Sequence, residues 1–505
     1  MAPTEAPTAA TQAPPPPPPP HFVIVPLVAQ GHTIPMVDLS RLLAGRGARV
    51  SLVTTPVNGA RLRGDAAQAA RAKLSLEIVE LPLPTGAGLP PGIENVDQVT
   101  DHNHFVPLFD ALWKLAGPLE AYLRALTPPP SCLISDWCNG WTAAVARRLG
   151  IPRLFFHGPS CFYSLCDLNA VDHGLHERTA AADDDQEKFV VPGMPVRVEV
   201  TKATAPGFLS SPGWETLWSE CVDAMRTADG AVVNTFSDLE EKFVACYEAA
   251  LGKPVWAVGP LCLANDKDDA EAMASRGDNS GVERSAAIAA WLDTKGTGSV
   301  VFVSFGSIAR KLPKQLFEVG HGLEDSGEPF LWVVKEAEVA SPETEEWLEA
   351  LEARVAGRAL VVRGWAPQLA VLSHRAVGGF VTHCGWNSLL ESMAHGVPVV
   401  TWPHFADQFL NERLVVDVLG VGVPVGAASP VMLFDDEKVA VAREDVVRAV
   451  SALMGGGAEA DERRRKAKEY GEKAHRAMEK GGSSYENLTQ LIESFRQSGG
   501  NGKDG

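Results

Sequence analysis

The amino-acid sequence predicts an α/β protein with two Rossmann-like parallel-sheet domains that face each other across a cleft. The chain has 505 residues, enough for two domains of ordinary size. In both halves, short apolar runs alternate with stretches of helical spacing, which is the pattern of parallel βαβ units. Between the halves, residues 263–281 are small and acidic and lack apolar periodicity, as linkers do. We therefore expect domains at 21–262 and 282–480.

The composition excludes several classes of protein. With 45% hydrophobic and 21% charged residues the chain is globular, and its net charge of −18 argues against nucleic-acid binding. The eight cysteines form no CxxC pair, which indicates reduced thiols in a cytoplasmic protein. No Lys or Arg precedes Arg41, and the early apolar runs are too short for a secretion signal or a membrane span.

The chain begins with a segment that cannot form a core. Residues 1–20 are mostly Ala, Pro and Thr and end in seven prolines, so we expect a disordered tail. The first domain follows at once with a buried strand at 21–26, a helix at 34–44 and a strand at 49–54. His32 lies in the turn between the first strand and the helix.

A second apolar strand brings an acidic partner to His32. Residues 131–136 read as a strand that ends in Asp136. In a parallel sheet the carboxyl ends of the strands share one edge, so His32 and Asp136 are expected to meet there. A carboxylate beside an imidazole orients the ring and stabilises its protonated form, which suits a general base.

Loops at the same edge are expected to line a ligand pocket. The segments 89–95 and 101–105 are rich in polar and aromatic groups. His157 ends a strand at this edge, where we expect it to contact a ligand. His102 and His104 have no third metal donor nearby, and the three aspartates at 183–185 follow no buried strand. We therefore predict no metal site.

The second domain opens with a strand that leads into glycine. Residues 231–240 and 253–260 read as the last strands of the first domain, and residues 299–305 as the first of the second. Gly306 then allows the backbone to approach a phosphate closely, and Ser307 can donate to it. The strands 331–334 and 359–362 continue the sheet.

The segment from Trp365 to Gln408 contains the strongest functional pattern. Two βα units can be read in it, and polar residues follow each strand: His383, Asn387, Ser388, Asp407 and Gln408. Free N–H groups at a helix N-terminus suit a phosphate, Glu391 can accept hydrogen bonds from sugar hydroxyls, and Trp365 offers a flat face to a base. These are the parts that a nucleotide sugar needs.

The order and spacing of this segment resemble the signature of plant family 1 UDP-glycosyltransferases. That signature runs over 44 residues from a Trp to a Gln or His, as Trp365 to Gln408 does, with HCGWNS at its centre. The resemblance covers nearly the whole chain after residue 21 and implies the GT-B fold, in which the last helix, here 481–497, returns to the first domain before a disordered tail at 498–505. Residues 443–453 and 461–495 show helical spacing, the latter interrupted at Gly481.

The resemblance also implies the roles of individual residues. His32 would be the general base and Asp136 its partner, because the QGH and ISD motifs match. Trp365 would stack on uracil, Gln368 and Glu391 would reach the ribose, and Asp407 and Gln408 would bind the sugar. The residues implied to bind the UDP-sugar are Ser307, Trp365, Ala366, Gln368, His383, Trp386, Asn387, Ser388, Glu391, Asp407 and Gln408. Those implied to bind the molecule that receives the sugar are Gln30, Gly31, Phe105 and His157.

The implied activity is transfer of glucose from UDP-glucose to a hydroxyl of a small lipophilic acceptor. Inversion at the sugar carbon would give a β-O-glucoside, without metal or cofactor. The motif AQGHTIPMVDLSRLLA and the region 92–95 resemble the plant group that acts on flavonoids, other phenolics, terpenoids and hormones. We expect a monomer. Two alternatives remain, a transferase that forms glucose esters and a catalytically silent UDP-sugar-binding protein. A nicotinamide enzyme is set aside because no GxGxxG follows the first strand.

Overall fold

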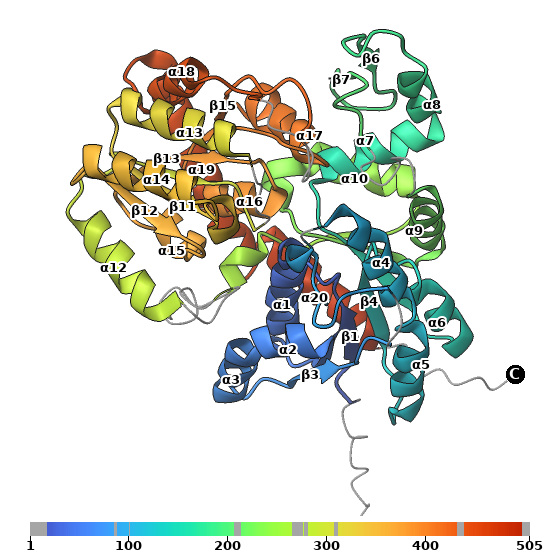
Figure 1. The fold of residues 1–505 in the computed structure, drawn as a ribbon. Helices are drawn as coiled ribbons and strands as arrows, with labels where there is room; N and C mark the ends of the chain where they lie inside the picture. The colour runs from blue at the N-terminus through green and yellow to red at the C-terminus, as the bar shows by residue number, and fades with distance from the viewer. Residues whose placement is uncertain are drawn as a thin grey trace, which may run out of the picture.

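The computed structural model describes residues 18–84, 88–99, 101–206, 214–264, 276, 281–307, 312–431 and 439–496 (Figure 1). Two α/β halves, each built around its own sheet, lie against each other. The tails expected at 1–20 and 498–505 and the linker expected at 263–281 lie mostly outside the described residues.

The first half is organised around a seven-stranded parallel sheet with the order β3-β2-β1-β4-β5-β8-β9. Strand β1 is buried along its whole length, and Phe22 lies between Val50 and Cys132 of its two neighbours. Such near-continuous apolar runs are typical of parallel strands that helices cover on both faces. The strands are β1 (His21–Val25), β2 (Arg49–Thr54), β3 (Leu76–Glu80), β4 (Cys132–Asp136), β5 (Arg153–His157), β8 (Gly230–Val233) and β9 (Val255–Ala257).

Helices connect these strands, and a small hairpin extends from the domain. The hairpin pairs β6 (Phe189–Val190) with β7 (Glu199–Val200). The helices are α1 (Gln30–Gly45), α2 (Pro56–Arg61), α3 (Arg63–Arg71), α4 (Phe105–Trp113), α5 (Ala116–Ala125), α6 (Thr142–Leu149), α7 (Cys161–Asp172), α8 (Leu175–Ala180), α9 (Glu215–Thr227) and α10 (Ser237–Leu251), with short 3₁₀ turns at Val96–Gln98, His102–His104 and Leu261–Ala264. The prediction of a strand over 231–240 is wrong in its second part, because β8 ends at Val233 and helix α10 begins at Ser237.

The second half contains a six-stranded parallel sheet with the order β12-β11-β10-β13-β14-β15. Its strands are β10 (Val300–Ser304), β11 (Phe330–Val334), β12 (Ala359–Arg363), β13 (Val377–Thr382), β14 (Val399–Thr401) and β15 (Gly422–Pro424). Its helices are α12 (Gly281–Asp293), α13 (Pro313–Ser326), α14 (Pro342–Arg354), α15 (Gln368–Leu372), α16 (Trp386–Ala394), α17 (Gln408–Arg413), α18 (Arg443–Met454) and α19 (Ala458–Met478), with a 3₁₀ turn at Glu336–Glu338 and a π-helical turn at Leu414–Val418.

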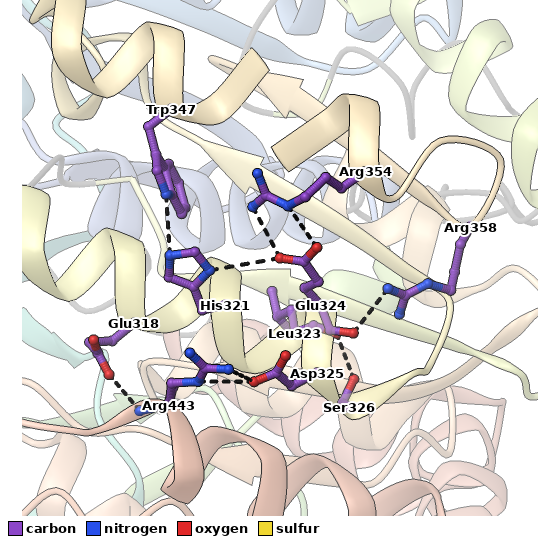
Figure 2. A network of polar contacts seen from close by, with 10 residues as sticks. All are labelled: Glu318, His321, Leu323, Glu324, Asp325, Ser326, Trp347, Arg354, Arg358 and Arg443. Atoms are coloured by element: carbon purple, nitrogen blue, oxygen red, sulfur yellow. Dashed lines mark hydrogen bonds and ion pairs between the residues drawn. The ribbon is translucent and has the colours of Figure 1, made fainter. Parts of the chain in front are cut away.

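Polar contacts join three helices on the outside of this second sheet (Figure 2). Glu324 of α13 accepts from the Nε of Arg354 of α14 at 2.8 Å, and Trp347 donates to His321 at 3.3 Å. Arg443, the first residue of α18, pairs with Asp325. The charged side chains are partly exposed, between 23% and 44%, so each pair contributes little to stability. None of these residues lines the cavity described below.

The last helix, α20 (Ser483–Arg496), packs on the first domain, although the chain reaches it from the second. The ring of Phe495 lies 5.9 Å from that of Phe22 in strand β1. The side-chain amide of Asn487 donates to the Ala257 carbonyl at 2.9 Å. A single buried cluster also contains Phe162 and Phe243 of the first domain with Leu389 of the second. The two sheets are therefore held in one arrangement by shared apolar packing.

The structure also bears on membrane insertion. Among the helices of the described residues, none combines the length and the apolar character that crossing a bilayer requires.

Candidate active site

A cavity lies between the carboxyl edges of the two sheets and is lined by both domains. Of the residues singled out from the sequence, those of the first domain that line it are Gln30, Gly31, His32 and Phe105. Those of the second domain are Ser307, Trp365, Ala366, Gln368, His383, Trp386, Asn387, Ser388, Glu391, Asp407 and Gln408. The fold thus brings together side chains from Gln30 to Gln408 that lie far apart in the chain.

His32 and Asp136 form a hydrogen-bonded pair at the wall of the cavity. The Nδ1 of His32 lies 2.7 Å from Oδ2 of Asp136, and the other carboxylate oxygen accepts from the backbone N–H of Cys138 at 2.9 Å. Strands β1 and β4 are adjacent and in register, which places the end of β4 beside the first turn of α1. The side chain of Asp136 is fully buried, whereas that of His32 is 31% exposed. With Nδ1 bonded to the carboxylate, Nε2 is the ring atom left to exchange a proton.

The charges around His32 tune its basicity. Burial lowers the pKa of the imidazole, but the nearby Asp136 carboxylate, through its charge and its hydrogen bond, outweighs that effect. Asp407, from the second domain, acts in the same direction, and the net result is a pKa above the usual value. Burial in turn raises the pKa of Asp407 to about 6. A base from one domain is therefore electrostatically coupled to an acid from the other.

The N-terminus of helix α16 faces the cavity without a capping side chain. Gly385 is the N-cap residue and, as a glycine, has no side chain that could accept from the first N–H groups of the helix. The ring of His383 lies against Gly306 and Gly385, where a Cβ would stand 2.6 and 2.5 Å from ring atoms. Cys384, between His383 and Gly385 in the chain, has a positive φ of 64°, a strained backbone conformation of the kind found at ligand sites. This tight turn forms a dipolar cradle that suits an anionic diphosphate.

A hydrogen-bonded acid lies one helical turn beyond the cradle. Glu391 is only 5% exposed, and its Oε2 accepts from the side-chain amide of Gln368 at 2.8 Å. The same amide donates to the Ser388 hydroxyl at 3.0 Å. Trp365 and the buried Ala366 lead into this region, and the ammonium of Lys335 lies 5.2 Å from the Trp365 ring. An aromatic face, an amide and a carboxylate thus occur side by side.

Arg276 enters the same region and was missed from the sequence. It lies in the segment expected to be a plain linker, yet its guanidinium forms ion pairs with Glu391 and with Asp38 of α1. The Asp38 contact measures 2.8 Å, and the side chains of Arg276 and Asp38 are only 11% and 2% exposed. Burial raises the pKa of Asp38, and Arg276 opposes that shift. No local pattern distinguishes this arginine, because its partners belong to both domains.

The turn before helix α17 also lines the cavity. The side-chain oxygen of Gln408 accepts from the backbone N–H groups of His404 and Phe405 at 2.8 and 3.1 Å. Asn411 donates to the Asp407 carboxylate at 2.7 Å and to the Cys384 carbonyl at 3.0 Å. These bonds fix the side chains of Asp407 and Gln408 relative to the cradle at the N-terminus of α16.

Trp386 and Asn387 attach the cradle to the first domain. The indole N–H of Trp386 donates to the Asn234 carbonyl at 2.8 Å, and the ring is 3% exposed. The Asn387 side chain accepts from the Asn234 amide at 3.2 Å and donates to the carbonyl of Gly31. Asn387 therefore connects α16 to the residue next to His32, and Asn234, which was not singled out from the sequence, bonds to both Trp386 and Asn387.

The expectation that His157 contacts a ligand is wrong. His157 is 1% exposed and does not line the cavity. Its Nδ1 bonds to the Tyr247 hydroxyl at 3.1 Å, and its ring packs at 5.4 Å from that of Trp137. Burial lowers its pKa to about 4, so the ring is neutral and structural. The strand β5 ends at the predicted edge, but Trp137 covers its last side chain.

The three aspartates considered for metal binding do not line the cavity. Asp183, Asp184 and Asp185 lie exposed on the surface, and Lys202 pairs with Asp185 at 3.3 Å. Within the described residues, the donor group that a metal could bridge is His32, Asp136 and Cys138, whose donor atoms lie within 4.8 Å of one another. Burial raises the pKa of the Cys138 thiol well above its usual range, which disfavours the thiolate that binds metals.

Aromatic side chains form the wall of the cavity on the side of the first domain. Phe105, Phe109, Trp137, Tyr163, Trp214 and Trp218 all line it. The ring of Phe109 lies 5.2 Å from that of Trp214, in an edge-to-face arrangement. Beside the His32 base, the cavity therefore offers a large apolar surface to a second ligand.

Comparison with known proteins gives consistent results for both halves. The family model described as UDP-glucoronosyl and UDP-glucosyl transferase matches residues 220–448, and the model of a glycosyltransferase N-terminal domain matches residues 21–263. The chain is 42% identical to UDP-glycosyltransferase 73E1 of Stevia rebaudiana over 94% of its length and 95% of that protein. It is 42% identical to UDP-glycosyltransferase 73C3 of Arabidopsis thaliana over 94% and 96% of the two chains.

Solved structures agree with these relatives. Glycyrrhiza uralensis UGT73P12, complexed with glycyrrhetinic acid 3-O-monoglucuronide, has a TM-score of 0.86 and 35% identity, with 95% of this chain and 96% of that chain covered. Phytolacca americana UGT2, complexed with UDP-2fluoro-glucose and pterostilbene, has a TM-score of 0.72 and 29% identity, with 94% and 99% covered. Arabidopsis thaliana UGT89C1, complexed with UDP-L-rhamnose, has the same TM-score and identity, with 95% and 99% covered.

Proposed function

The chain belongs to the plant UDP-glycosyltransferase family, and from that premise we propose that it transfers glucose from UDP-glucose to a hydroxyl of a small lipophilic acceptor. The family establishes a UDP-dependent glycosyltransferase of the GT-B fold that acts on small molecules. The observation that carries the proposal is the position of His32, whose carboxylate-bound imidazole borders the same cavity as the cradle at the N-terminus of α16.

In the proposed reaction His32 acts as the general base. Its Nε2 takes the proton of the acceptor hydroxyl while the oxygen forms a bond to C1 of the sugar. The bond from C1 to the diphosphate oxygen breaks, and UDP leaves with the electron pair. Attack from the face opposite UDP inverts C1, so an α-linked donor gives a β-O-glucoside. Asp136 stabilises the imidazolium that forms.

The charge that develops on the leaving diphosphate falls on the α16 cradle. We propose that the free N–H groups of the helix, with His383, Asn387, Ser388 and Ser307, stabilise it in place of a metal. Trp365 would stack on the uracil, Gln368 and Glu391 would bind the ribose, and Asp407 and Gln408 would bind the sugar hydroxyls. The carboxylate and amide bonds that fix these side chains support the assignment.

The proposal is tested by mass spectrometry of reactions with UDP-glucose, UDP-galactose and UDP-glucuronic acid and a panel of phenolic, terpenoid and steroid acceptors. We expect the mass gain of one hexose with UDP-glucose, unchanged after treatment with a chelator and after addition of Mg²⁺ or Mn²⁺. Absence of transfer to every acceptor, with UDP still bound in calorimetry, would favour a silent UDP-sugar-binding protein. Transfer confined to carboxylic acids would favour the ester-forming alternative.

We also propose a reducing cytoplasmic location. All eight cysteines are free thiols, and seven of them are buried. A fluorescent fusion expressed in plant cells is expected to fill the cytoplasm, and concentration in the endoplasmic reticulum would contradict the assignment.

A further inference from the structure

The aromatic side of the cavity contains a carboxyl that the proposed transfer does not use. Asp167 lies on helix α7, one turn after Tyr163, and both side chains line the cavity. The Asp167 side chain is buried, with 9% of the residue exposed, and no partner among the described residues bonds to its Oδ1. A buried polar group without a hydrogen bond is costly, so its presence needs an explanation.

A nearby acid shows what a structural role looks like. Glu240 is also buried, but its carboxylate accepts from the backbone N–H groups of Cys161 and Phe162 at 3.2 and 2.8 Å and so holds the start of α7. Asp167 makes no such bond, and no Lys, Arg or His of the described residues forms an ion pair with it. Burial, with no compensating partner, raises the pKa of Asp167 to about 7. The raised pKa reflects the cost of placing a charged carboxylate at this position without a donor beside it.

The surroundings of Asp167 indicate the kind of ligand that would compensate this cost. Tyr163, Trp214 and Trp218 line the same cavity, so the Asp167 carboxyl is a polar group in a part of the lining that is rich in aromatic side chains. Such an arrangement binds an apolar skeleton and fixes its orientation through one hydrogen bond.

Asp167 and His32 contribute to the wall of the same cavity from different elements, helix α7 and the first turn of helix α1. A ligand that places one hydroxyl at His32 can therefore contact Asp167 with another part of its skeleton.

We propose that Asp167 binds a second hydrogen-bond donor of the acceptor, an O–H or N–H at the end of an apolar skeleton opposite the hydroxyl that receives the sugar. The inference rests on the proposed function and names its acceptor class, which is rigid aromatic or polycyclic diols and amino alcohols. Asp167 thus orients the acceptor and sets regiochemistry.

The test compares acceptors that differ only in that second group. The probes are 4-hydroxybiphenyl, 4,4′-dihydroxybiphenyl and 4′-(aminomethyl)biphenyl-4-ol, with a longer pair, 4-hydroxystilbene and 4,4′-dihydroxystilbene. Calorimetry in the presence of saturating UDP gives Kd without turnover, and product mass gives kcat/KM. We expect at least one diol to bind about tenfold more tightly than its mono-ol, beyond the statistical factor of about two. The amine decides whether an ammonium or a hydroxyl is the better donor.

Variants of Asp167 connect the preference to this carboxyl. In Asp167→Leu the ratio of diol to mono-ol affinity should fall to the statistical value, whereas Asp167→Asn, which keeps an acceptor oxygen, should retain part of it. Both variants should unfold at a higher temperature than the parent, because the unpartnered buried carboxyl is gone. Asp172→Asn on the same helix, whose exposed carboxylate pairs with Arg226 at 3.1 Å, is the matched control and should keep the parent ratio.

Two results would overturn the inference. One is equal binding of mono-ol and diol by the parent for both skeletons, and the other is a diol preference that survives in Asp167→Leu. A diol preference in calorimetry without any product would leave the role of Asp167 intact and contradict the proposed transfer. Product formation without a diol preference would support the proposed transfer and contradict the role of Asp167.

Discussion

The guanidinium of Arg276 forms an ion pair with the carboxylate of Glu391, although Arg276 lies between the two domains in the chain and Glu391 belongs to helix α16. Asp38 of helix α1 pairs with the same guanidinium at 2.8 Å. The charge of Arg276 thereby compensates two buried acids that face each other across the cleft. Under the proposed function, the donor ribose would bind Glu391 beside this arginine.

Replacement of Arg276 by Gln should destabilise the protein. Removal of one partner leaves buried charges unpaired, at a cost of about 3–5 kcal/mol. Urea unfolding measures the loss, and the double variant with Asp38→Asn should lose less than the sum of the single changes. The control is Arg413→Gln, because Arg413 and its partner Asp417 are 50% and 53% exposed and such pairs contribute at most about 1 kcal/mol. Equal stability of the two Arg variants would show that the buried triad contributes nothing.

Replacement of His32 by Ala should strongly slow transfer while the donor still binds. Loss of a general base lowers kcat by about 10²–10⁴-fold, and the UDP-binding groups lie on the other domain. Steady-state rates and UDP calorimetry separate the two effects. His374→Ala is the control, because His374 contacts Asp293 and does not line the cavity. A parent-like rate in His32→Ala would mean that another group takes the proton.

The pH dependence should reveal the influence of Asp136 on His32. The base must be neutral to accept a proton, so kcat/KM should rise with pH, with a midpoint above the ordinary value of 6.5 because the pKa of His32 is raised. In Asp136→Asn the negative charge is gone, so this midpoint should move to lower pH while the maximal rate falls. Asp407, with its pKa of about 6, titrates in both proteins and so does not account for the difference. An identical midpoint in parent and variant would rule out the electrostatic coupling.

Gly306→Ala should weaken binding of the donor. The new Cβ would stand 2.6 Å from the Cε1 of His383 and would push the ring out of the cradle. Gly298→Ala is a matched control, since Gly298 also has a positive φ, 65° against 83°, but a Cβ there meets no atom within 4 Å. Both changes carry a backbone cost of about 1–2 kcal/mol. Only Gly306→Ala should raise KM for UDP-glucose, and equal KM values would show that the ring position is not critical.

Gln408→Glu should impair donor binding more than folding. The side-chain oxygen of Gln408 accepts two backbone N–H bonds, and a carboxylate can accept the same bonds. What the variant lacks is the NH₂ donor that we assign to a sugar hydroxyl, so KM for UDP-glucose should rise about tenfold, equivalent to about 1.4 kcal/mol. Gln408→Ala should lose thermal stability as well. Unchanged kinetics in Gln408→Glu would remove this residue from the donor site.

Strand ends could be predicted from the sequence because the relevant signal is local. Short apolar runs bounded by Gly and polar residues indicated β1, β4, β10 and β13, and the fixed geometry of parallel sheets then gathered their carboxyl ends at one edge. For this reason His32, Asp136 and the 365–408 segment could all be named in advance. The prediction for His157 used the same rule and is wrong, because a strand end can still be covered by a neighbouring side chain, here Trp137.

Local spacing determined most strands of the two sheets and the polar residues that follow them, but it did not indicate the edge strands β3 and β15. Only the tertiary structure decided the contacts between the domains, in which Arg276 lies between Asp38 and Glu391 and Asn234 bonds to Trp386. The same holds for Asp167, whose Oδ1 bonds to no partner among the described residues. The physical reason is that burial and partnership depend on atoms distant in sequence. A carboxylate has the same appearance in a sequence whether a cation, a backbone N–H or nothing at all lies beside it.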